Sequence, residues 1–212
     1  MVRFLPVAYS RVLEIGCADG EFRQNLTGEH EYRGVEPVRS AANTASKRLD
    51  NVLVGTYAEV EGDIPNDYFD LVICNDVIEH MVDHDKFLGA IKHKLSHGGC
   101  IVASIPNVRY VTNLFGLLVQ KDWKYEESGI RDRTHMRYFT RKSLVRTFVE
   151  NGYSISMVEG VNPYHGRTLT RRLACSVAVL VFGGDVKFLQ FGIRAIENSP
   201  PNRLPLPAIK HD

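Results

Sequence analysis

The sequence predicts a doubly wound α/β domain with a mostly parallel, seven-stranded sheet. A short apolar run at 12–15 breaks into a glycine-containing turn at 16–20, as a buried strand does before a helix. The run at 68–74 is apolar at nearly every position, which is typical of a parallel strand covered on both faces. Apolar runs and helical patterns alternate along most of the chain, as they do in consecutive β-α units.

The composition is that of one globular domain. With 212 residues, 44% of them apolar and 24% charged, the chain can bury a sizeable core. The formal net charge of +1 gives no reason to expect a nucleic-acid partner. Four dispersed cysteines without a CxxC pair are typical of reduced thiols, and we therefore expect a cytoplasmic protein. The longest apolar run, 173–183, is too short to cross a bilayer, so we expect no integral membrane segment.

The first half of the chain follows a regular strand–helix order. Two apolar residues four apart predict a helix at 21–26, and Pro37 suits the first turn of the next helix. The helix after the fourth strand carries an apolar stripe that reaches Leu95, and Gly98-Gly99 are expected to end it. The strands of this half are expected at 12–15, 32–36, 51–54, 68–74 and 100–105.

Residues 107–139 interrupt this alternation. Apolar residues from Val108 to Leu118 form one helical face, and the stretch at 121–133 is polar and aromatic without a regular pattern. Long irregular inserts in compact domains are usually lids or binding loops, so we expect an inserted helical lid at about 107–139.

The remainder of the chain is expected to complete the domain over 1–196. Thr140 can cap a helix that ends at Asn151-Gly152, and strands follow at 153–161 and 186–196. Four prolines mark 197–212 as a C-terminal tail. A helix is expected at 167–182. Arg171-Arg172 before its apolar run would suit a membrane interface, but the run is nearly continuous rather than one-sided. We therefore expect burial against the sheet or against a second subunit in a homodimer.

Two strand ends indicate a nucleoside-containing cofactor. Glu36 ends the second strand 20 residues after Gly16, the spacing at which a carboxylate can accept hydrogen bonds from a ribose. The dinucleotide pattern G-x-G-x-x-G does not occur, because Gly16, Ala18 and Gly20 give G-x-A-x-G. A nicotinamide-dependent oxidoreductase is therefore a disfavoured alternative.

Preceded by Glu14, this turn resembles the first motif of class I S-adenosylmethionine-dependent methyltransferases, E/D-x-G-x-G-x-G, with Ala18 in place of the middle glycine. The resemblance, to domains of the type 11/23 group, implies a Rossmann-like fold and S-adenosyl-L-methionine as cofactor. It implies that Glu36 holds the ribose hydroxyls of the cofactor, while the backbone of residues 16–20 lies near the amino-acid part of the cofactor. Thr56 stands where the family often has Asp, so the adenine contacts are left to a ring and to backbone. The implied cofactor-binding residues are Glu14, Gly16, Cys17, Gly20, Glu36, Pro37, Tyr57, Ala58, Asn75 and Asp76.

His135 is the first catalytic candidate. Methyl transfer from a sulfonium is an in-line displacement, so a hydroxyl acceptor must be aligned and must lose its proton, which a histidine can accept near neutral pH. The stretch around it, 132–140, resembles one found in methyltransferases encoded with polysaccharide and lipid-glycan biosynthesis enzymes. The alternative is a histidine that only anchors the loop. Arg133 and Arg137 would then grip an anionic group of the acceptor or lie in solvent.

His80 is the second catalytic candidate. Asp76-x-x-Glu79-His80 resembles the E-x-x-E-H segment of ubiquinone-pathway O-methyltransferases, whose side chains can hold a divalent cation. In relatives without metal, the same Glu-His pair braces the following helix. We expect no metal here.

The expected function is S-adenosylmethionine-dependent methyl transfer, most often to oxygen, on a sugar, glycan precursor or other small metabolite of polysaccharide biosynthesis. A catalytically silent scaffold with a cofactor fold is the other alternative.

Overall fold

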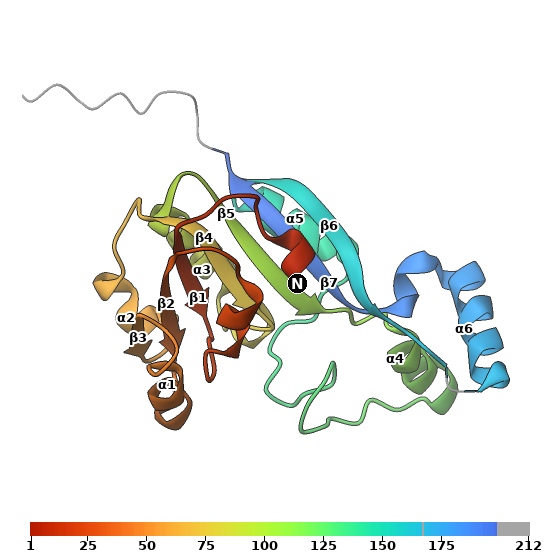
Figure 1. Cartoon of the computed structure of the whole chain (residues 1–212). Helices are drawn as coiled ribbons and strands as arrows, with labels where there is room; N and C mark the ends of the chain where they lie inside the picture. The colour runs from red at the N-terminus through yellow and green to blue at the C-terminus, as the bar shows by residue number, and fades with distance from the viewer. Residues whose placement is uncertain (167, 199–212) are drawn as a thin grey trace, which may run out of the picture.

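The computed structural model describes residues 1–166 and 168–198. Of the tail predicted at 197–212, Glu197 still belongs to the last strand, and residues 199–212 lie outside the described residues. Seven strands form one sheet in the order β3-β2-β1-β4-β5-β7-β6 (Figure 1). Neighbouring strands pair in parallel from β3 to β5, whereas β7 runs antiparallel between β5 and β6. The strands are β1 (Arg11–Ile15), β2 (Glu31–Glu36), β3 (Asn51–Val54), β4 (Phe69–Asn75), β5 (Leu95–Pro106), β6 (Tyr153–Pro163) and β7 (Phe188–Glu197). The fold class predicted from the sequence is confirmed.

Short helices connect the strands. The α-helices are α1 (Arg39–Ala45), α2 (Tyr57–Val60), α3 (His84–Ile91), α4 (Val111–Phe115), α5 (Arg141–Glu150) and α6 (Leu169–Phe182). Single turns of 3-10 helix are η1 (Val2–Phe4), η2 (Glu21–Asn25), η3 (Glu61–Asp63), η4 (Ile78–His80), η5 (Lys92–Lys94) and η7 (Gly184–Lys187), and η6 (Gly116–Gln120) is a π-helical turn. Thr140 caps α5 as predicted, since its hydroxyl accepts from the Ser143 N–H at 3.1 Å.

The core lies on both faces of the sheet. Successive strand residues point to opposite faces, so Val72 of β4 joins the cluster under α3 and α5, while Leu71 and Ile73 join the cluster around Phe4 and α1. All three β4 side chains are fully buried, as the nearly continuous apolar run at 68–74 predicts.

Two predicted boundaries were wrong in this half of the chain. The helix expected at 21–26 is only the 3-10 turn η2. Leu95 does not end a helix but starts β5, and Gly98-Gly99 lie inside that strand. The sheet requires a glycine at this place, because a Cβ on Gly99 would lie 2.7 Å from the Phe69 carbonyl oxygen. A register shift between Phe69 and Leu71 marks the same irregularity.

The last helix differs from expectation in its packing. The structure describes α6 from Leu169 to Phe182, and none of its residues is buried, so the predicted burial against the sheet is wrong. Figure 1 shows α4 and α6 standing clear of the sheet beyond the ends of β6 and β7. Among the described residues, no helix is long and apolar enough to cross a membrane.

The insert at 107–139 is helical only in its first part. After α4 and η6 the chain runs to Thr140 without a regular element, apart from isolated bridges that pair Asn107 with Phe139 and Glu126 with Asp132. The predicted helical face is poorly covered, since Phe115 and Leu118 are 53% and 55% exposed.

Candidate functional site

The turn after β1 brings backbone N–H groups to the carboxyl-end edge of the sheet. Gly16 and Gly20 have φ values of +68° and +79°, which favour glycine. The N–H groups of Gly16 and Cys17 both donate to the Val35 carbonyl of β2, at 2.8 and 3.1 Å. A Cβ on Gly16 would lie 2.6 Å from Val77 Cγ2. The turn is therefore packed tightly between β2 and the loop after β4.

Glu36 ties this turn to the end of β2. Its Oε2 accepts from the Ala18 N–H at 2.9 Å and its Oε1 from the Val38 N–H at 2.8 Å. The residue is 6% exposed, and Pro37 beside it is exposed. Each carboxylate oxygen has a second lone pair, so the pair of backbone bonds fixes the carboxylate without using all of its acceptor capacity.

The side chains of Glu14 and Cys17 are buried on the inner side of the turn and hold it against β2. Glu14 is 3% exposed, its Oε2 accepts from the Tyr32 hydroxyl at 2.8 Å, and burial raises its pKa to about 8. The Cys17 side chain is buried against β2, since a Cβ on Gly34 would lie 2.5 Å from its Sγ. Only the backbone of Cys17 belongs to the open side of the turn.

A hollow of about 400 Å³ lies between α2 and the start of α3. Tyr57, Ala58 and His80 line it, and the Tyr57 ring meets the Phe87 ring edge-on at 4.9 Å between centroids. The Tyr57 hydroxyl is buried and has no hydrogen-bond partner in the described part of the chain.

Asn75 is the last residue of β4 and Asp76 follows it, beside the turn at 16–20. Asn75 Oδ1 is buried and accepts no hydrogen bond from the described residues. Asp76 has a φ of +54°, and its Oδ1 accepts from Gln190 Nε2 of β7 at 2.6 Å. An unpartnered acceptor at this point suits a ligand that brings a donor, such as an ammonium group.

Glu79, His80 and His135 form a cluster although they come from distant parts of the chain. Glu79 is 1% exposed, and both of its carboxylate oxygens lack a hydrogen-bond partner within the described ranges. Burial raises the pKa of Glu79 to about 8. His135 Nε2 lies 4.0 Å from Glu79 Oε1, and the two imidazole rings are 4.6 Å apart between centroids.

The hydrogen bonds fix the tautomers of both histidines. His135 Nδ1 lies 3.1 Å from the Ile130 carbonyl oxygen, which only accepts, so Nδ1 carries the proton and Nε2 has a free lone pair. His80 Nδ1 donates in the same way to Thr134, whose hydroxyl in turn donates to Asp132 at 2.7 Å. Ligand atoms of Glu79, His80 and His135 all lie within 4.8 Å of one another, so the cluster could hold a metal ion.

The backbone of Glu79 anchors the end of the insert. Its carbonyl accepts from the N–H groups of Met136 and Arg137, at 2.8 and 3.0 Å. The other end is held by Asn107, which is fully buried and donates from Nδ2 to the carbonyls of Asp185 and Phe188. These two anchors bring His135 against η4.

Some expected residues have other partners, and two important ones were missed. Arg133 forms an exposed ion pair with Glu127. Arg137 Nη2 donates to the Val82 carbonyl at 2.6 Å, which fixes its side chain and leaves its positive charge in place. Glu79 was predicted as a metal ligand or as a brace for the following helix, and not as a buried carboxyl group that faces His135. Asn107 was predicted only as the first residue of the insert, and nothing local predicts its distant partners.

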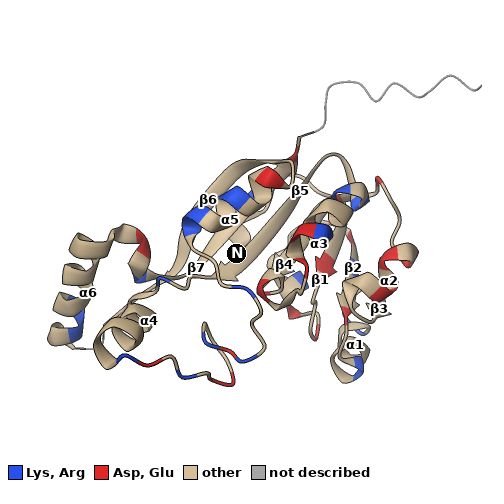
Figure 2. Cartoon of the chain, turned by 180° about the vertical axis from the view of Figure 1, so that it is seen from behind, with Lys and Arg blue, Asp and Glu red and all other residues tan. Residues whose placement is uncertain are grey.

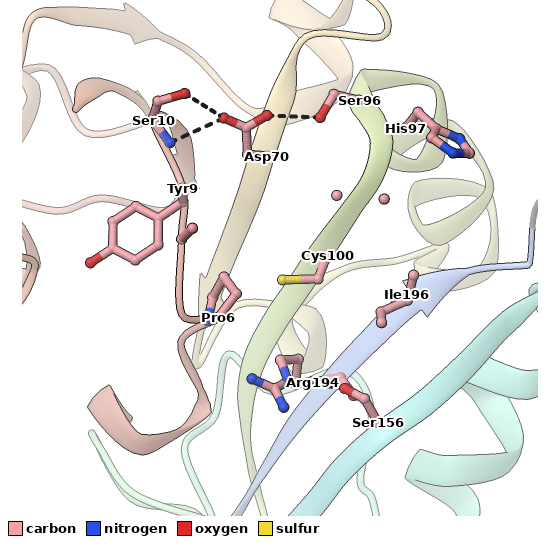
Figure 3. A pocket seen from close by; sticks show the side chains of 13 residues that line it. Pro6, Tyr9, Ser10, Asp70, Ser96, His97, Cys100, Ser156, Arg194 and Ile196 are labelled. Atoms are coloured by element: carbon pink, nitrogen blue, oxygen red, sulfur yellow. Dashed lines mark hydrogen bonds between the residues drawn. The ribbon is translucent and has the colours of Figure 1, made fainter.

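A second hollow, of about 500 Å³, lies at the opposite edge of the sheet (Figure 3). Its polar groups are largely satisfied by one another, since Asp70 accepts from Ser10, Arg11 and Ser96. Burial alone would raise the pKa of Asp70, but these hydrogen bonds outweigh it and hold the pKa well below its usual range. This hollow is separate from the turn and the histidine cluster.

The sheet order, the glycine turn against an acidic second strand end and the cluster beyond β4 define a class I S-adenosylmethionine-dependent methyltransferase. The comparison with known families agrees, because the model of the family described as "Methyltransferase domain" matches residues 2–157. The chain belongs to this family. The nicotinamide-dependent alternative is thereby excluded.

Relatives agree with this assignment. The chain is 28% identical over 159 residues to the ubiquinone biosynthesis O-methyltransferase of Nitrobacter winogradskyi, a match that covers 71% of this chain and 59% of that protein. It is 25% identical over 175 residues to the mitochondrial one of Homo sapiens, covering 76% and 46%. The chain thus spans about half the length of these curated relatives. A SAM-dependent methyltransferase of Archaeoglobus fulgidus has the same fold, with a TM-score of 0.63 at 19% identity over 89% of this chain and 86% of that one.

Proposed function

We propose that the protein transfers the methyl group of S-adenosyl-L-methionine to a hydroxyl oxygen of a small acceptor, with His135 as the general base. The observation that carries this proposal is the free Nε2 lone pair of His135 beside the buried, unpartnered carboxyl group of Glu79. A base of this kind is required for a hydroxyl acceptor, because its proton must leave as the carbon–oxygen bond forms.

The residues at the sheet edge fit the cofactor. The remaining lone pairs of Glu36 suit the ribose hydroxyls, and Asn75 Oδ1 suits the ammonium of the methionine part. Gly16, Gly20 and the backbone of Cys17 leave room for close approach, with Asp76 beside them. Tyr57 and Ala58 line the hollow proposed for the adenine, and exposed Pro37 borders the ribose.

The chain's own groups then move one proton. When bound, S-adenosyl-L-methionine supplies an electrophilic methyl group on a sulfonium, whose sulfur keeps the electron pair of the broken bond. His135 Nε2 accepts the hydroxyl proton while Nδ1 stays bonded to the Ile130 carbonyl, which holds the ring in place. A Glu79 carboxylate that has already released its own proton to solvent, 4.0 Å from His135 Nε2, stabilises the imidazolium as it forms.

A second candidate for the same site is a transfer assisted by a divalent cation, which departs from the sequence-based expectation of no metal. The observation that favours it is the approach of Glu79, His80 and His135, whose ligand atoms lie within 4.8 Å of one another, while the Ile130 carbonyl holds His135 Nδ1. Two imidazoles and one carboxylate suit Mn²⁺, Fe²⁺ or Zn²⁺. Turnover lost on treatment with EDTA and restored by one of these ions would favour this candidate, and undiminished turnover in EDTA would exclude it.

The acceptor is proposed to be a sugar or glycan precursor, because the stretch at 132–140 resembles one in methyltransferases encoded with polysaccharide and lipid-glycan biosynthesis enzymes. The curated relatives are named for ubiquinone biosynthesis, so phenolic acceptors form the other arm of the test. The experiment follows methyl-labelled S-adenosylmethionine with sugar, nucleotide-sugar and catechol acceptors, and identifies the methylated atom by mass spectrometry and NMR. Transfer only to nitrogen or carbon would contradict the proposal. Tight binding of S-adenosylhomocysteine without transfer to any acceptor would favour the scaffold alternative.

A further inference from the structure

The first residues of β7 lie at the site edge of the sheet. β7 runs antiparallel to β5, so it starts where the parallel strands end, and Figures 1 and 2 show this start beside α4 and α6. Gln190 lies opposite Pro106, the last residue of β5, and opposite Val161 of β6. Its side chain is therefore level with the loop that follows β4.

Gln190 is held in one orientation. Its Oε1 accepts from Asn162 Nδ2 of β6 at 2.7 Å, and its Nε2 donates to Asp76 Oδ1 at 2.6 Å. An ionised carboxylate only accepts hydrogen bonds, so the amide must turn its NH2 group toward Asp76. The contact with Asn162 agrees with that orientation, because it gives the amide oxygen a donor. The three side chains thus form a chain of hydrogen bonds from the edge strand β6 across β7 to the loop after β4.

The backbone of Asp76 is fixed as well. Its N–H donates to the Ser104 carbonyl of β5 at 3.0 Å, and its φ of +54° is uncommon for a residue with a side chain. Val77, the next residue, packs against Gly16, where a Cβ would lie 2.6 Å from Val77 Cγ2. Asp76 itself is exposed, so its carboxylate is accessible to a ligand beside the turn at 16–20.

The charge of this carboxylate is not neutralised by the described part of the chain. No described Lys, Arg or His forms an ion pair with Asp76, and Gln190 is a neutral donor. Asp70, by contrast, pairs with Arg11 at 3.0 Å. A neutral donor fixes the direction of a carboxylate and leaves its negative charge available to a cationic ligand. The cofactor carries such a group, the ammonium of its methionine part, for which Asn75 Oδ1 is proposed as an acceptor.

We propose that Gln190 is a positioning residue, which holds the uncompensated carboxylate of Asp76 toward the ammonium of bound S-adenosyl-L-methionine. The proposal rests on the proposed role of Asp76 in the cofactor site and deepens it. It also gives the start of β7 a second task, because the carbonyls of Phe188 and Leu189 accept from Asn107, the anchor of the insert. One short segment thus holds both the loop after β4 and the first end of the insert.

The test is calorimetric titration of the full chain with S-adenosylhomocysteine, which carries the same ammonium. Gln190→Leu removes the donor at similar volume and is expected to lower the affinity about threefold. Gln190→Lys keeps a donor for Asp76 but neutralises its charge, so the affinity should fall about tenfold. The reverse order, with the Lys variant close to the unmodified protein, would mean that Gln190 only holds β7 against the loop and would overturn the proposal. The same two substitutions at Gln24, an exposed glutamine of η2, are the matched control and should leave the affinity unchanged.

Asp76→Asn separates this proposal from the proposed cofactor site. The variant should lose about tenfold in affinity for S-adenosylhomocysteine. Adding Gln190→Leu should cost little more, because the two residues act through one hydrogen bond and their effects are not additive. Normal affinity in Asp76→Asn would remove Asp76 from the cofactor site, and the proposal with it. Loss in Asp76→Asn together with normal affinity in both Gln190 variants would overturn the proposal alone.

A second route to the same contact leaves Gln190 in place, since that side chain is half-buried and its variants are checked by thermal unfolding. Asn162→Asp keeps a residue that tolerates the φ of +53° at this position. An aspartate there can only accept, so it draws the amide NH2 of Gln190 away from Asp76. We expect a loss of affinity of about threefold. A folded Asn162→Asp protein that binds S-adenosylhomocysteine like the unmodified one would overturn the proposal.

Discussion

The proposed cofactor side and the proposed acceptor side of this molecule satisfy the polar groups of their buried acids in different ways. On the cofactor side, the buried acids have partners within the fold: Glu14 bonds to Tyr32, and Glu36 to two backbone N–H groups. On the acceptor side, Glu79 is equally buried and has no hydrogen-bond partner among the described residues, and α6 leaves its leucines uncovered. The acids of the first region are thus fixed before any ligand arrives, although Asn75 Oδ1 and the Tyr57 hydroxyl there lack a partner among the described residues. The second has groups that only a ligand, a proton or a surface can satisfy.

The sharpest test of this contrast is His135→Ala. Because His135 is proposed to move the acceptor's proton and does not contact the turn at 16–20, turnover should fall by roughly 10²–10⁴-fold while affinity for S-adenosylhomocysteine stays nearly intact. Steady-state kinetics and calorimetric titration measure the two. His97→Ala, an exposed histidine at the opposite edge of the sheet, is the control.

His135→Asn separates proton transfer from anchoring. Asparagine keeps some hydrogen-bonding capacity but accepts no proton near neutral pH. Loss of turnover in both variants supports the base, whereas rescue by Asn means that His135 only anchors the insert. If both variants turn over like the unmodified enzyme, His80 becomes the next candidate.

Glu36→Ala tests the cofactor side. The change removes a charged acceptor whose hydrogen bonds are worth about 1.5–3 kcal/mol, so affinity for S-adenosylmethionine should fall by roughly ten- to a hundredfold. Glu29→Ala removes an exposed acid just before β2 and should leave affinity unchanged. A folded Glu36→Ala protein with normal affinity would exclude the ribose role.

Glu14→Gln tests whether the cofactor side is organised by a neutral acid. Burial raises the pKa of Glu14 from 4.5 to about 8, so between these pH values the folded protein holds a proton that the unfolded chain releases. The free energy of unfolding should therefore fall as pH rises from about 5 to 8. Glutamine keeps an acceptor for the Tyr32 hydroxyl and does not titrate. At pH 8 the free energy of unfolding of the variant should therefore exceed that of the unmodified protein by roughly 2–4 kcal/mol. Denaturant unfolding at several pH values measures this, and equal pH slopes would contradict it.

Amide hydrogen exchange of the insert tests the proposed acceptor side, and the expected change in exchange rate is the smallest effect predicted here. The part of the insert at 121–139 has few regular backbone hydrogen bonds, so its amides should exchange fast in the free protein and slow severalfold with cofactor and acceptor bound. The amides of Met136 and Arg137, which bond to Glu79, should be slow in both states. Uniform protection of the insert without ligands would mean a fixed structure rather than a lid.

The sequence predicted the proposed cofactor side well and the proposed acceptor side poorly. The strand ends at Gly16 and Glu36 follow from local patterns, since apolar periodicity and glycine conformation operate over a few residues. The start of β5 at Leu95 was missed because pairing with Phe69 overrides a helical stripe. The Glu79–His135 contact joins residues 56 apart through the anchors of Met136, Arg137 and Asn107. No local pattern specifies such contacts. The apolar run of α6 was detected, but whether it is covered depends on the rest of the fold.

The position of β7 has a consequence for folding. This strand is the last of the seven along the chain, yet it lies between β5 and β6 and holds both through long antiparallel ladders. Among the first five strands, β1–β2, β2–β3 and β4–β5 are consecutive pairs, and β1 pairs with β4 across two intervening strands. None of these pairings needs a later segment, so the five strands can assemble while the rest of the chain is still unfolded. Asn107 finds its carbonyl partners at 185 and 188 only when β7 inserts. During synthesis on the ribosome, the cofactor-side edge can therefore form well before the insert is anchored and His135 reaches Glu79.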